Sequence, residues 1–400
     1  MMKKHIKKCL FFISAFSVFS VYPAQNKPWT FLVYMAAAND LNSCALLDLQ
    51  EMMQAGSNSN VNIIVYLTLQ EDGQSKETKK LYVEKGFLTQ IGPTMVRDSG
   101  DVATLMEALQ WAYSDYPSDN IAVVLWDHGP GPSDKFRYRR SFKGVCYDFD
   151  TGNYLTDRDC LQAFSWGCDI LRGGKKYDII ACDACLLASV EMAYTFSSCA
   201  DYFVAPEGVI PGDSYRYAHI LNQCGMQLYD SFSFAKCMVG TSNDEYYGMS
   251  DYTLSVMDLN ALQPLIDNVN AVAQVLSSHL KGKNYTVVKT AIKKAVNINN
   301  CPSFDNGIYI DMLQFYKNLL KHSAALQLSK TIAQQFQQVL VSGIAILSTL
   351  IKANVTSASF KNAGGLSIYF SRYSIDPSYY GLYWTEKNPN WLNFLEAFLG

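Results

Sequence analysis

The sequence has few charged residues for its length and shows no extended basic stripe. Charged residues make up 17% of its 400 residues, the formal net charge is −3, and Lys and Arg occur only in small clusters. Proteins that bind nucleic acid usually concentrate positive charge on one surface, because that surface attracts the phosphate backbone. We therefore expect no nucleic-acid partner for this chain.

Beyond its N-terminal end, the sequence also lacks an apolar run long enough to cross a membrane. Residues 339–351 are mostly apolar, but the segment is only 13 residues long and contains Ser342, Gly343 and Ser348. A membrane-spanning helix needs about 20 apolar residues. The segment is therefore predicted to be a buried helix, and no stable membrane span is expected after the N-terminal end.

Residues 1–24 have the pattern of a secretory signal peptide. Four lysines between positions 3 and 8 precede an apolar stretch from Cys9 to about Tyr22. A positive segment followed by a short apolar one is typical of a signal that is removed on export. We expect cleavage between Ser20 and Gln25 and a periplasmic or secreted protein. The alternative is a retained membrane anchor.

The cysteines do not define a disulfide framework. Of eleven cysteines, ten remain once Cys9 is removed with the signal, and their spacings show no compact pattern. An exported protein can pair some of them, so the count leaves the redox state open.

We expect the mature chain to be a monomer.

Strand-like and helix-like segments alternate through the first 257 residues. Strands are predicted at 29–36, 61–69, 81–87, 120–126, 144–149, 177–181, 201–205 and 252–257. Helices are predicted between them at 41–53, 102–113, 156–171 and 186–196. This alternation predicts an α/β fold with a largely parallel central sheet flanked by helices.

The pattern changes after residue 257. Helices are predicted at 258–282, 284–297, 307–320, 323–351 and 391–399, with one late strand at 365–371. The chain therefore divides into a signal peptide (1–24), an α/β core (25–257) and a mostly helical C-terminal region (258–400) that returns a strand.

Two buried strands end on chemically active residues. The run at 123–127 leads into His128 and Gly129, and the run at 179–184 leads into Cys185. Functional groups in parallel sheets lie at the carboxyl ends of strands. A cysteine and a histidine brought together there make a thiol nucleophile with an acid–base partner. The separation of 57 residues leaves room for one helical crossover between neighbouring strands.

Cys185 is also expected to precede a helix that begins near Leu186. The positive end of a helix dipole lowers the pKa of a thiol and so favours the reactive thiolate. The alternatives are a buried structural cysteine at 185 and a core or surface histidine at 128.

These motifs resemble those of the clostripain-like cysteine peptidases, within the caspase-like group of folds. His128-Gly129 and Asp183-Ala184-Cys185-Leu186 carry the resemblance. Further segments are similar to the family in the same order along the chain, at 34–41, 144–155, 189–191, 206–214, 252–259, 305–313 and 365–370. The resemblance implies a caspase-like layered fold and covers most of the mature chain.

The resemblance also implies a Cys–His dyad that cleaves proteins or peptides and requires no cofactor. Cys185 would attack the scissile carbonyl, and His128 would polarise the thiol and then protonate the leaving amine. The backbone N–H groups of Gly129 and Cys185 would stabilise the oxyanion. The group needs no third member, so Asp127 is interpreted as a supporting or surface carboxylate and not as an orienter of the histidine.

Members of the family cleave after arginine or lysine, which requires a negatively charged pocket for the P1 side chain. Asp183, two residues before the nucleophile, matches the acidic position of the family. Asp213, in a Pro-Gly-Asp loop, is the second candidate, with an ordinary turn aspartate as the alternative. A carboxylate pairs strongly with a guanidinium group.

Activation in this family often involves self-cleavage at a basic residue between the histidine and the cysteine. Arg140 and Lys143 lie in a basic loop at 137–143, and Arg172 with residues 175–176 forms another. Either loop is a candidate cleavage site, and a solvated basic loop is the alternative.

A calcium site is a weaker hypothesis. Residues 148–153 (Asp-Phe-Asp-Thr-Gly-Asn) have spaced carboxylates, but they lack the ligand number and the terminal glutamate of an EF-hand loop. Some relatives respond to calcium, so calcium stays open as a ligand although no metal is required.

Two rival functions stay open. Cys182 and Cys185 form a C-x-x-C pair, which is typical of thiol–disulfide exchange proteins. In a peptidase, the same pair would be able to form a disulfide that switches the enzyme off. The second rival function is that of a non-catalytic member of the family, which acts as a binding protein.

Overall fold

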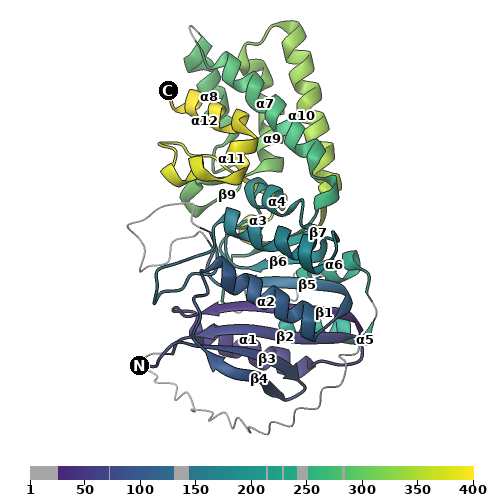
Figure 1. Cartoon of the computed structure of the whole chain (residues 1–400). Helices are drawn as coiled ribbons and strands as arrows, with labels where there is room; N and C mark the ends of the chain where they lie inside the picture. Colours follow the sequence, from purple (N-terminus) through teal and green to yellow (C-terminus); the bar gives the residue numbers. More distant parts are fainter. Residues whose placement is uncertain are drawn as a thin grey trace, which may run out of the picture.

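The computed structural model describes residues 26–71, 73–129, 144–212, 215–227, 229–240, 251–281 and 284–400. These residues form one sheet of nine strands and one of three. Helices cover both faces of the larger sheet, and most of the C-terminal helices gather at one end of the molecule (Figure 1).

The larger sheet has a parallel centre with antiparallel strands on both sides. Its strands are β1 (Lys27–Ala37), β2 (Val61–Leu69), β3 (Glu77–Glu84), β4 (Phe87–Met95), β5 (Ser118–Trp126), β6 (Tyr177–Asp183), β7 (Ala200–Ala205), β8 (Thr253–Asp258) and β11 (Ile351–Thr356). They lie in the order β11-β8-β7-β6-β5-β1-β2-β3-β4, and the five from β7 to β2 run parallel. The predicted α/β class with a largely parallel sheet is confirmed.

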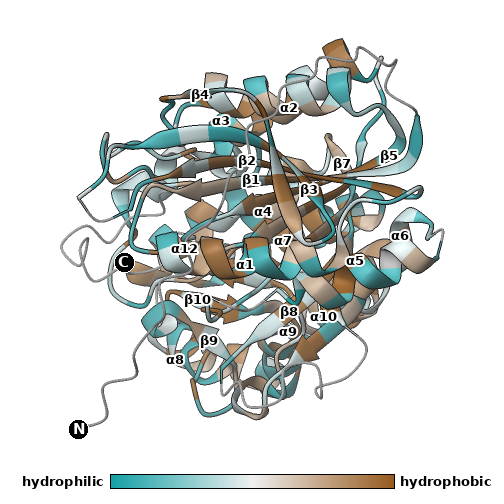
Figure 2. Ribbon diagram, turned by 90° about the horizontal axis from the view of Figure 1, so that it is seen from below, coloured by the Kyte–Doolittle hydropathy of each residue, from teal (hydrophilic) through white to brown (hydrophobic). Residues whose placement is uncertain are grey.

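Two apolar cores lie on opposite faces of this sheet. Successive residues of a strand point to opposite faces, so Phe31 and Val33 belong to one core and Leu32 and Tyr34 to the other. The first core is covered by α1 (Asn42–Ala55), α5 (Tyr217–Met226) and α6 (Ser231–Val239). The second is covered by α2 (Val102–Asp115), α3 (Asp157–Trp166) and α4 (Val190–Phe196). Figure 2 shows these strands as largely hydrophobic between amphipathic helices.

The C-terminal part extends the second core. It contains α7 (Gln263–His279), α8 (Tyr285–Ala295), α9 (Met312–His322), α10 (Lys330–Leu350), α11 (Tyr383–Lys387) and α12 (Pro389–Leu399). Its small sheet has the order β12-β10-β9, with β9 (Ser303–Phe304), β10 (Tyr309–Asp311) and β12 (Ser367–Tyr369). Among the residues that the structure describes, no helix is both long and apolar enough to cross a lipid bilayer.

Several predicted elements differ from those observed. The helix predicted at 323–351 ends at Leu350, and β11 follows and pairs antiparallel with β8, so the C-terminal region contributes an edge strand to the larger sheet. The single strand predicted at 81–87 is the hairpin of β3 and β4. The strand predicted at 144–149 is reduced to one bridge between Val145 and Leu155. Pairing with the distant strand β8 overrides the local helical pattern at β11. The other two differences arise from pairing between segments that are close in sequence.

Two buried carboxyl groups join the segment after β7 to the C-terminal part. Glu207 accepts a hydrogen bond from Gly365 N at 2.8 Å, and Asp311 accepts one from Gln314 N at 2.6 Å. Burial, followed by the neighbouring Asp311 carboxyl, raises the pKa of Glu207 well above its usual range, and burial raises the pKa of Asp311 to about 6. Because the pKa of Glu207 is raised further by the neighbouring carboxyl, we assign the retained proton to Glu207.

We expect this pair to make stability depend on pH. Because the folded pKa values are raised, the stabilisation is complete below the unfolded values near pH 4 and is lost as pH rises through the folded values. Between the unfolded and the folded pKa values, the free energy of unfolding should fall by about 1.4 kcal/mol per pH unit, because the folded state retains one proton that the unfolded state has lost. Glu207→Gln keeps a donor toward Asp311 without titrating and should flatten the dependence.

Guanidinium unfolding between pH 5 and 9 measures this difference, with Glu71→Gln, an exposed glutamate, as the matched control. If the free energy of unfolding changed equally with pH in the wild type and in Glu207→Gln, the assignment of a retained proton to Glu207 would be contradicted.

Candidate functional site

The ends of β5 and β6 meet as the sequence predicts. The two strands are parallel neighbours, with Trp126 in register with Asp183. Three residues after Trp126, Gly129 packs directly against the backbone of Cys185. A Cβ atom on residue 129 would lie only 1.8 Å from the Cys185 carbonyl oxygen. Only glycine permits this approach. The histidine turn and the cysteine therefore lie side by side.

A cavity of about 360 Å³ opens at this edge of the sheet. Its lining contains four of the predicted site residues, His128, Gly129, Asp183 and Cys185. The other lining residues are Leu41, Trp126, Asp127, Ala184, Val209, Ile210, Pro211 and Gly212. Three further predicted site residues lie outside the described residues, namely Asp213, Arg140 and Lys143.

The Cys185 sulfur is hydrogen-bonded to the backbone of Ile210, which also lines the cavity. Ile210 N donates to the sulfur at 3.5 Å, and the thiol donates to Ile210 O at 3.8 Å. Burial raises the pKa of Cys185. In this arrangement the thiol is held in its protonated form.

The predicted helix start at Leu186 is wrong. The helix α4 begins at Val190 with Ser189 as its N-cap, and Leu186 has a φ of 63°. The intervening residues instead bond to the segment after β7, with Leu186 N donating to Gly208 O and Ala188 N to Pro206 O. A helix dipole therefore does not act directly on the Cys185 thiol, and lowering of its pKa must come from another group.

His128 is held from two sides. Its Nε2 lies 2.7 Å from Oδ1 of Asp40, and its ring is stacked on Phe149 with centroids 6.0 Å apart and an interplanar angle of 2°. With Asp40 accepting the Nε2 proton, Nδ1 is the nitrogen available for proton exchange. The sequence-based interpretation gave Asp40 no role beyond its place in the segment 34–41 that is similar to the family. Asp40 follows β1, the neighbour of β5, but the sequence does not show that these two strands are adjacent.

A buried polar network fixes the loop that carries Asp40. The Asn39 amide donates to Asp127 Oδ1 at 2.6 Å and to Tyr147 O at 3.0 Å, and its oxygen accepts from Leu41 N. Asp127 also accepts a hydrogen bond from Tyr147 N. Asp127 is thus buried and not a surface carboxylate, and burial raises its pKa well above its usual range. It supports the loops around His128 and does not contact the ring nitrogen that binds Asp40.

Asp183 supplies a carboxylate to the cavity wall. It is 7% exposed, and its Oδ2 accepts a hydrogen bond from the Tyr217 hydroxyl at 2.9 Å. The tyrosine belongs to α5, so a helix on the face of the sheet fixes the orientation of a side chain at the end of β6.

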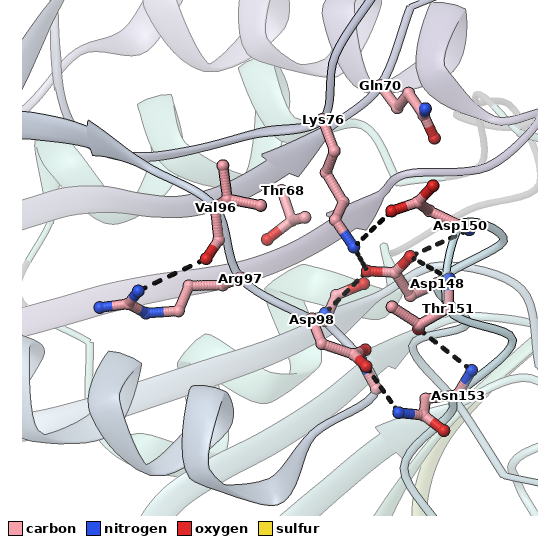
Figure 3. A network of polar contacts seen from close by, with 12 residues as sticks. Thr68, Gln70, Lys76, Val96, Arg97, Asp98, Asp148, Asp150, Thr151 and Asn153 are labelled. Carbon is pink, nitrogen blue, oxygen red and sulfur yellow. Dashed lines mark hydrogen bonds and ion pairs between the residues drawn. The ribbon is translucent and has the colours of Figure 1, made fainter.

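The proposed calcium loop contains an ammonium group in place of a metal ligand set. Lys76 Nζ lies 2.8 Å from Asp148 Oδ2 and 3.3 Å from Asp150 Oδ2 (Figure 3). The second Asp148 oxygen accepts from the backbone N–H groups of Asp150 and Thr151. No group of three or more His, Cys, Asp or Glu side chains suited to a metal ion occurs in the described parts of the chain. Lys76 pairs with both carboxylates and so balances one of their two negative charges within the chain.

The two cysteines of the C-x-x-C pair lie in different environments. Cys182 is fully buried in β6 with Cys146 nearby, and burial raises its pKa. Cys185 lines the cavity, where its sulfur contacts Ile210. Both are free thiols. This separation gives no support to a dithiol centre at these residues.

The Lys76–Asp148 pair should contribute strongly to stability, because both side chains are almost fully buried, at 5% and 0% exposure. Lys76→Met keeps the side-chain volume but leaves the Asp148 charge buried without its cation. We expect a loss of about 3–5 kcal/mol in the free energy of unfolding. Urea denaturation measures it.

Lys79→Met is the matched control. Lys79 lies in β3, three residues after Lys76, and pairs with Glu77, whose side chain is 50% exposed. Its loss should change stability by less than about 1 kcal/mol. A similar small loss for Lys76→Met would contradict the buried-pair interpretation.

Comparison with known proteins gives one family. A model of the Clostripain family matches residues 33–388. Clostripain from Hathewaya histolytica is 24% identical over 342 residues, which cover 73% of this chain and 62% of that protein. The chain therefore spans less than two thirds of the length of this curated relative.

Solved structures show the same fold. An inactive zymogen C11 protease from Parabacteroides distasonis has a TM-score of 0.62 and 20% identity, covering 91% of this chain and 99% of that chain. A secreted C11 cysteine protease from Bacteroides thetaiotaomicron, in complex with an irreversible peptide inhibitor, has a TM-score of 0.62 and 21% identity, covering 92% and 98%. The fold expected from the resemblance is confirmed.

Proposed function

Because the chain belongs to the clostripain family, we propose that it is a cysteine endopeptidase with Cys185 as nucleophile and His128 as acid–base partner. The observation that carries this proposal is the packing of the histidine turn against Cys185, through Gly129, at the edge of one cavity. The chemistry needs a thiol and an imidazole at one substrate-sized site, and these residues supply both.

The proposed reaction uses these groups in the following order. Substrate binding displaces the Ile210 backbone from the Cys185 sulfur, and the thiol proton passes to His128. The sulfur attacks the scissile carbonyl, and the backbone N–H groups of Gly129 and Cys185 stabilise the oxyanion. His128 protonates the leaving amine, and water then hydrolyses the thioester with His128 as base.

Asp40 positions the imidazole for these proton transfers. Its carboxylate lies 2.7 Å from Nε2, and the ring is stacked on Phe149, so rotation of the ring is opposed from two directions. This role adds a positioning residue to the Cys–His pair that the sequence predicted.

Asp40→Asn should lower kcat roughly ten- to a hundredfold with little change in KM, because a small misplacement of a catalytic group has an effect of this size. Steady-state kinetics measure kcat and KM separately. Asp101→Asn, which alters a helix-capping carboxylate outside the cavity lining, is the control. An unchanged kcat in Asp40→Asn would show that the hydrogen bond has no catalytic role.

The proposed substrates are proteins or peptides with arginine or lysine at P1. Asp183 places a carboxylate in the cavity wall, and a carboxylate pairs well with a guanidinium or ammonium group. Asp213, outside the described residues, is the second proposed contact.

Self-cleavage and export complete the proposal. A basic specificity would allow the enzyme to cut its own chain at Arg140 or Lys143, between the histidine and the cysteine. The lysine-rich start and apolar stretch within residues 1–24 support export. The relatives include a protease described as a zymogen and one described as secreted.

One variant tests both activity and self-cleavage. Wild-type protein should hydrolyse peptides with Arg or Lys at P1 and spare those with Asp or Asn, whereas Cys185→Ala should lose at least about a thousandfold in kcat/KM. The variant should also stay single-chain on a denaturing gel while the wild type splits.

Cys182→Ser is the control, because a peptidase should retain its activity without this buried thiol. Loss of activity in Cys182→Ser but not in His128→Ala would instead indicate a dithiol enzyme. Absence of any cleavage by folded wild-type protein, under reducing conditions and with or without calcium, would favour a binding function.

A further inference from the structure

A second pair of cysteines lies in contact outside the cavity lining. Cys168 belongs to a π-helix, η2 (Gly167–Leu171), and Cys199 immediately precedes β7. The Cys168 sulfur lies 3.4 Å from the Cys199 carbonyl oxygen. The Cys199 sulfur in turn lies 3.3 Å from the hydroxyl oxygen of Ser165, three residues before Cys168. The two cysteine side chains are therefore neighbours although 31 residues separate them in the sequence.

The Cys199 sulfur is surrounded by groups that stabilise a thiolate. The hydroxyl oxygens of Ser165 and Ser198 lie 3.3 and 3.4 Å from it. The neighbouring Cys168 thiol first, and then these two hydroxyl groups and the charge of Lys176, lower the pKa of Cys199 to about 6. A thiolate beside a protonated thiol is the pairing from which disulfides form.

Other buried thiols of the chain lack such surroundings. Burial raises the pKa of Cys146, Cys160 and Cys182, so these sulfurs stay protonated. Reactivity toward an oxidant follows thiolate character and exposure, and since Cys199 and these three thiols are all buried, thiolate character decides among them. Of these buried groups, Cys199 is therefore the one prepared to react first.

The backbone holds the two cysteines at this distance. Tyr177 N donates to Cys199 O at 2.8 Å, and Gly174 N donates to Cys168 O at 2.8 Å. Gly167 allows the π-helix to lie against β6, because a Cβ atom there would be 2.0 Å from the Tyr177 hydroxyl oxygen. The contact between the sulfurs is thus determined by three elements of the fold and not by two flexible side chains.

We propose that Cys168 and Cys199 form a redox site, in which a two-electron oxidation joins their sulfurs in a disulfide. With hydrogen peroxide as oxidant, the Cys199 thiolate attacks one peroxide oxygen, which gives a sulfenic acid and hydroxide. The Cys168 sulfur then attacks the sulfenic sulfur, and its proton leaves with the sulfenic oxygen as water. One peroxide is reduced for each disulfide formed. A thiol reductant reverses the reaction.

The position of this disulfide gives it a structural consequence. The closed loop from 168 to 199 would contain β6, Cys185 and α4, so it would tie down the segment that delivers the cavity cysteine. Closing a loop reduces the entropy of the unfolded chain and stabilises the folded one. The effect does not depend on the peptidase function proposed above.

Disulfide mapping on the full chain tests this site, in a Cys185→Ala background that removes the cavity thiol. The folded protein is treated with hydrogen peroxide, alkylated with iodoacetamide and digested for mass spectrometry. We expect a linked peptide pair containing Cys168 and Cys199, lighter by two hydrogens than the separate peptides. The oxidised protein should unfold several degrees higher than the same protein after reduction.

Cys168→Ser separates this site from general thiol oxidation. The variant should show no linked pair and no gain in unfolding temperature on peroxide treatment, whereas Cys160→Ser, a nearby buried thiol on α3, should behave like the parent. Full alkylation of both Cys168 and Cys199 after peroxide treatment, or their linkage to other cysteines, would overturn the proposal. The mapping on the parent protein needs no substitution at either position.

Discussion

The candidate site depends on one close contact between two backbones, that of Gly129 against Cys185. The parallel pairing of β5 and β6 brings the two strand ends to the same edge of the sheet. The missing Cβ at residue 129 then lets the histidine turn approach the cysteine without an intervening side chain. The cavity, the position of His128 and the proposed oxyanion donors all follow from this approach.

Loops from other strands then orient the groups that this contact brings together. Asp40 follows β1 and binds the imidazole, while Phe149 stacks on the same ring. The loop of Phe149 is held by the buried pair of Lys76 and Asp148. An ammonium group thus performs, inside the chain, the charge neutralisation that a metal ion performs in other loops. The cost of burying these charges is offset because each is paired and hydrogen-bonded.

Much of the fold was predictable, and the errors have a common cause. The parallel strands were evident because each is an apolar run buried on both faces of the sheet. The helix expected from Leu186 fails because residues 186–188 pair with the segment after β7, and β11 was missed because it forms only against β8. Asp40 was given no role from the sequence, since the sequence does not show which strand lies beside β5.

The sequence by itself determined the fold class, the family resemblance and the placing of His128 and Cys185 at the ends of two buried strands, because periodicity and motif order are local properties of the chain. Only the tertiary structure decided the environment of each group. It placed the Cys185 thiol against Ile210, Lys76 in the acidic loop, and Cys168 beside Cys199. Protonation and reactivity depend on burial and on neighbours that are distant in sequence, and folding alone brings those neighbours together.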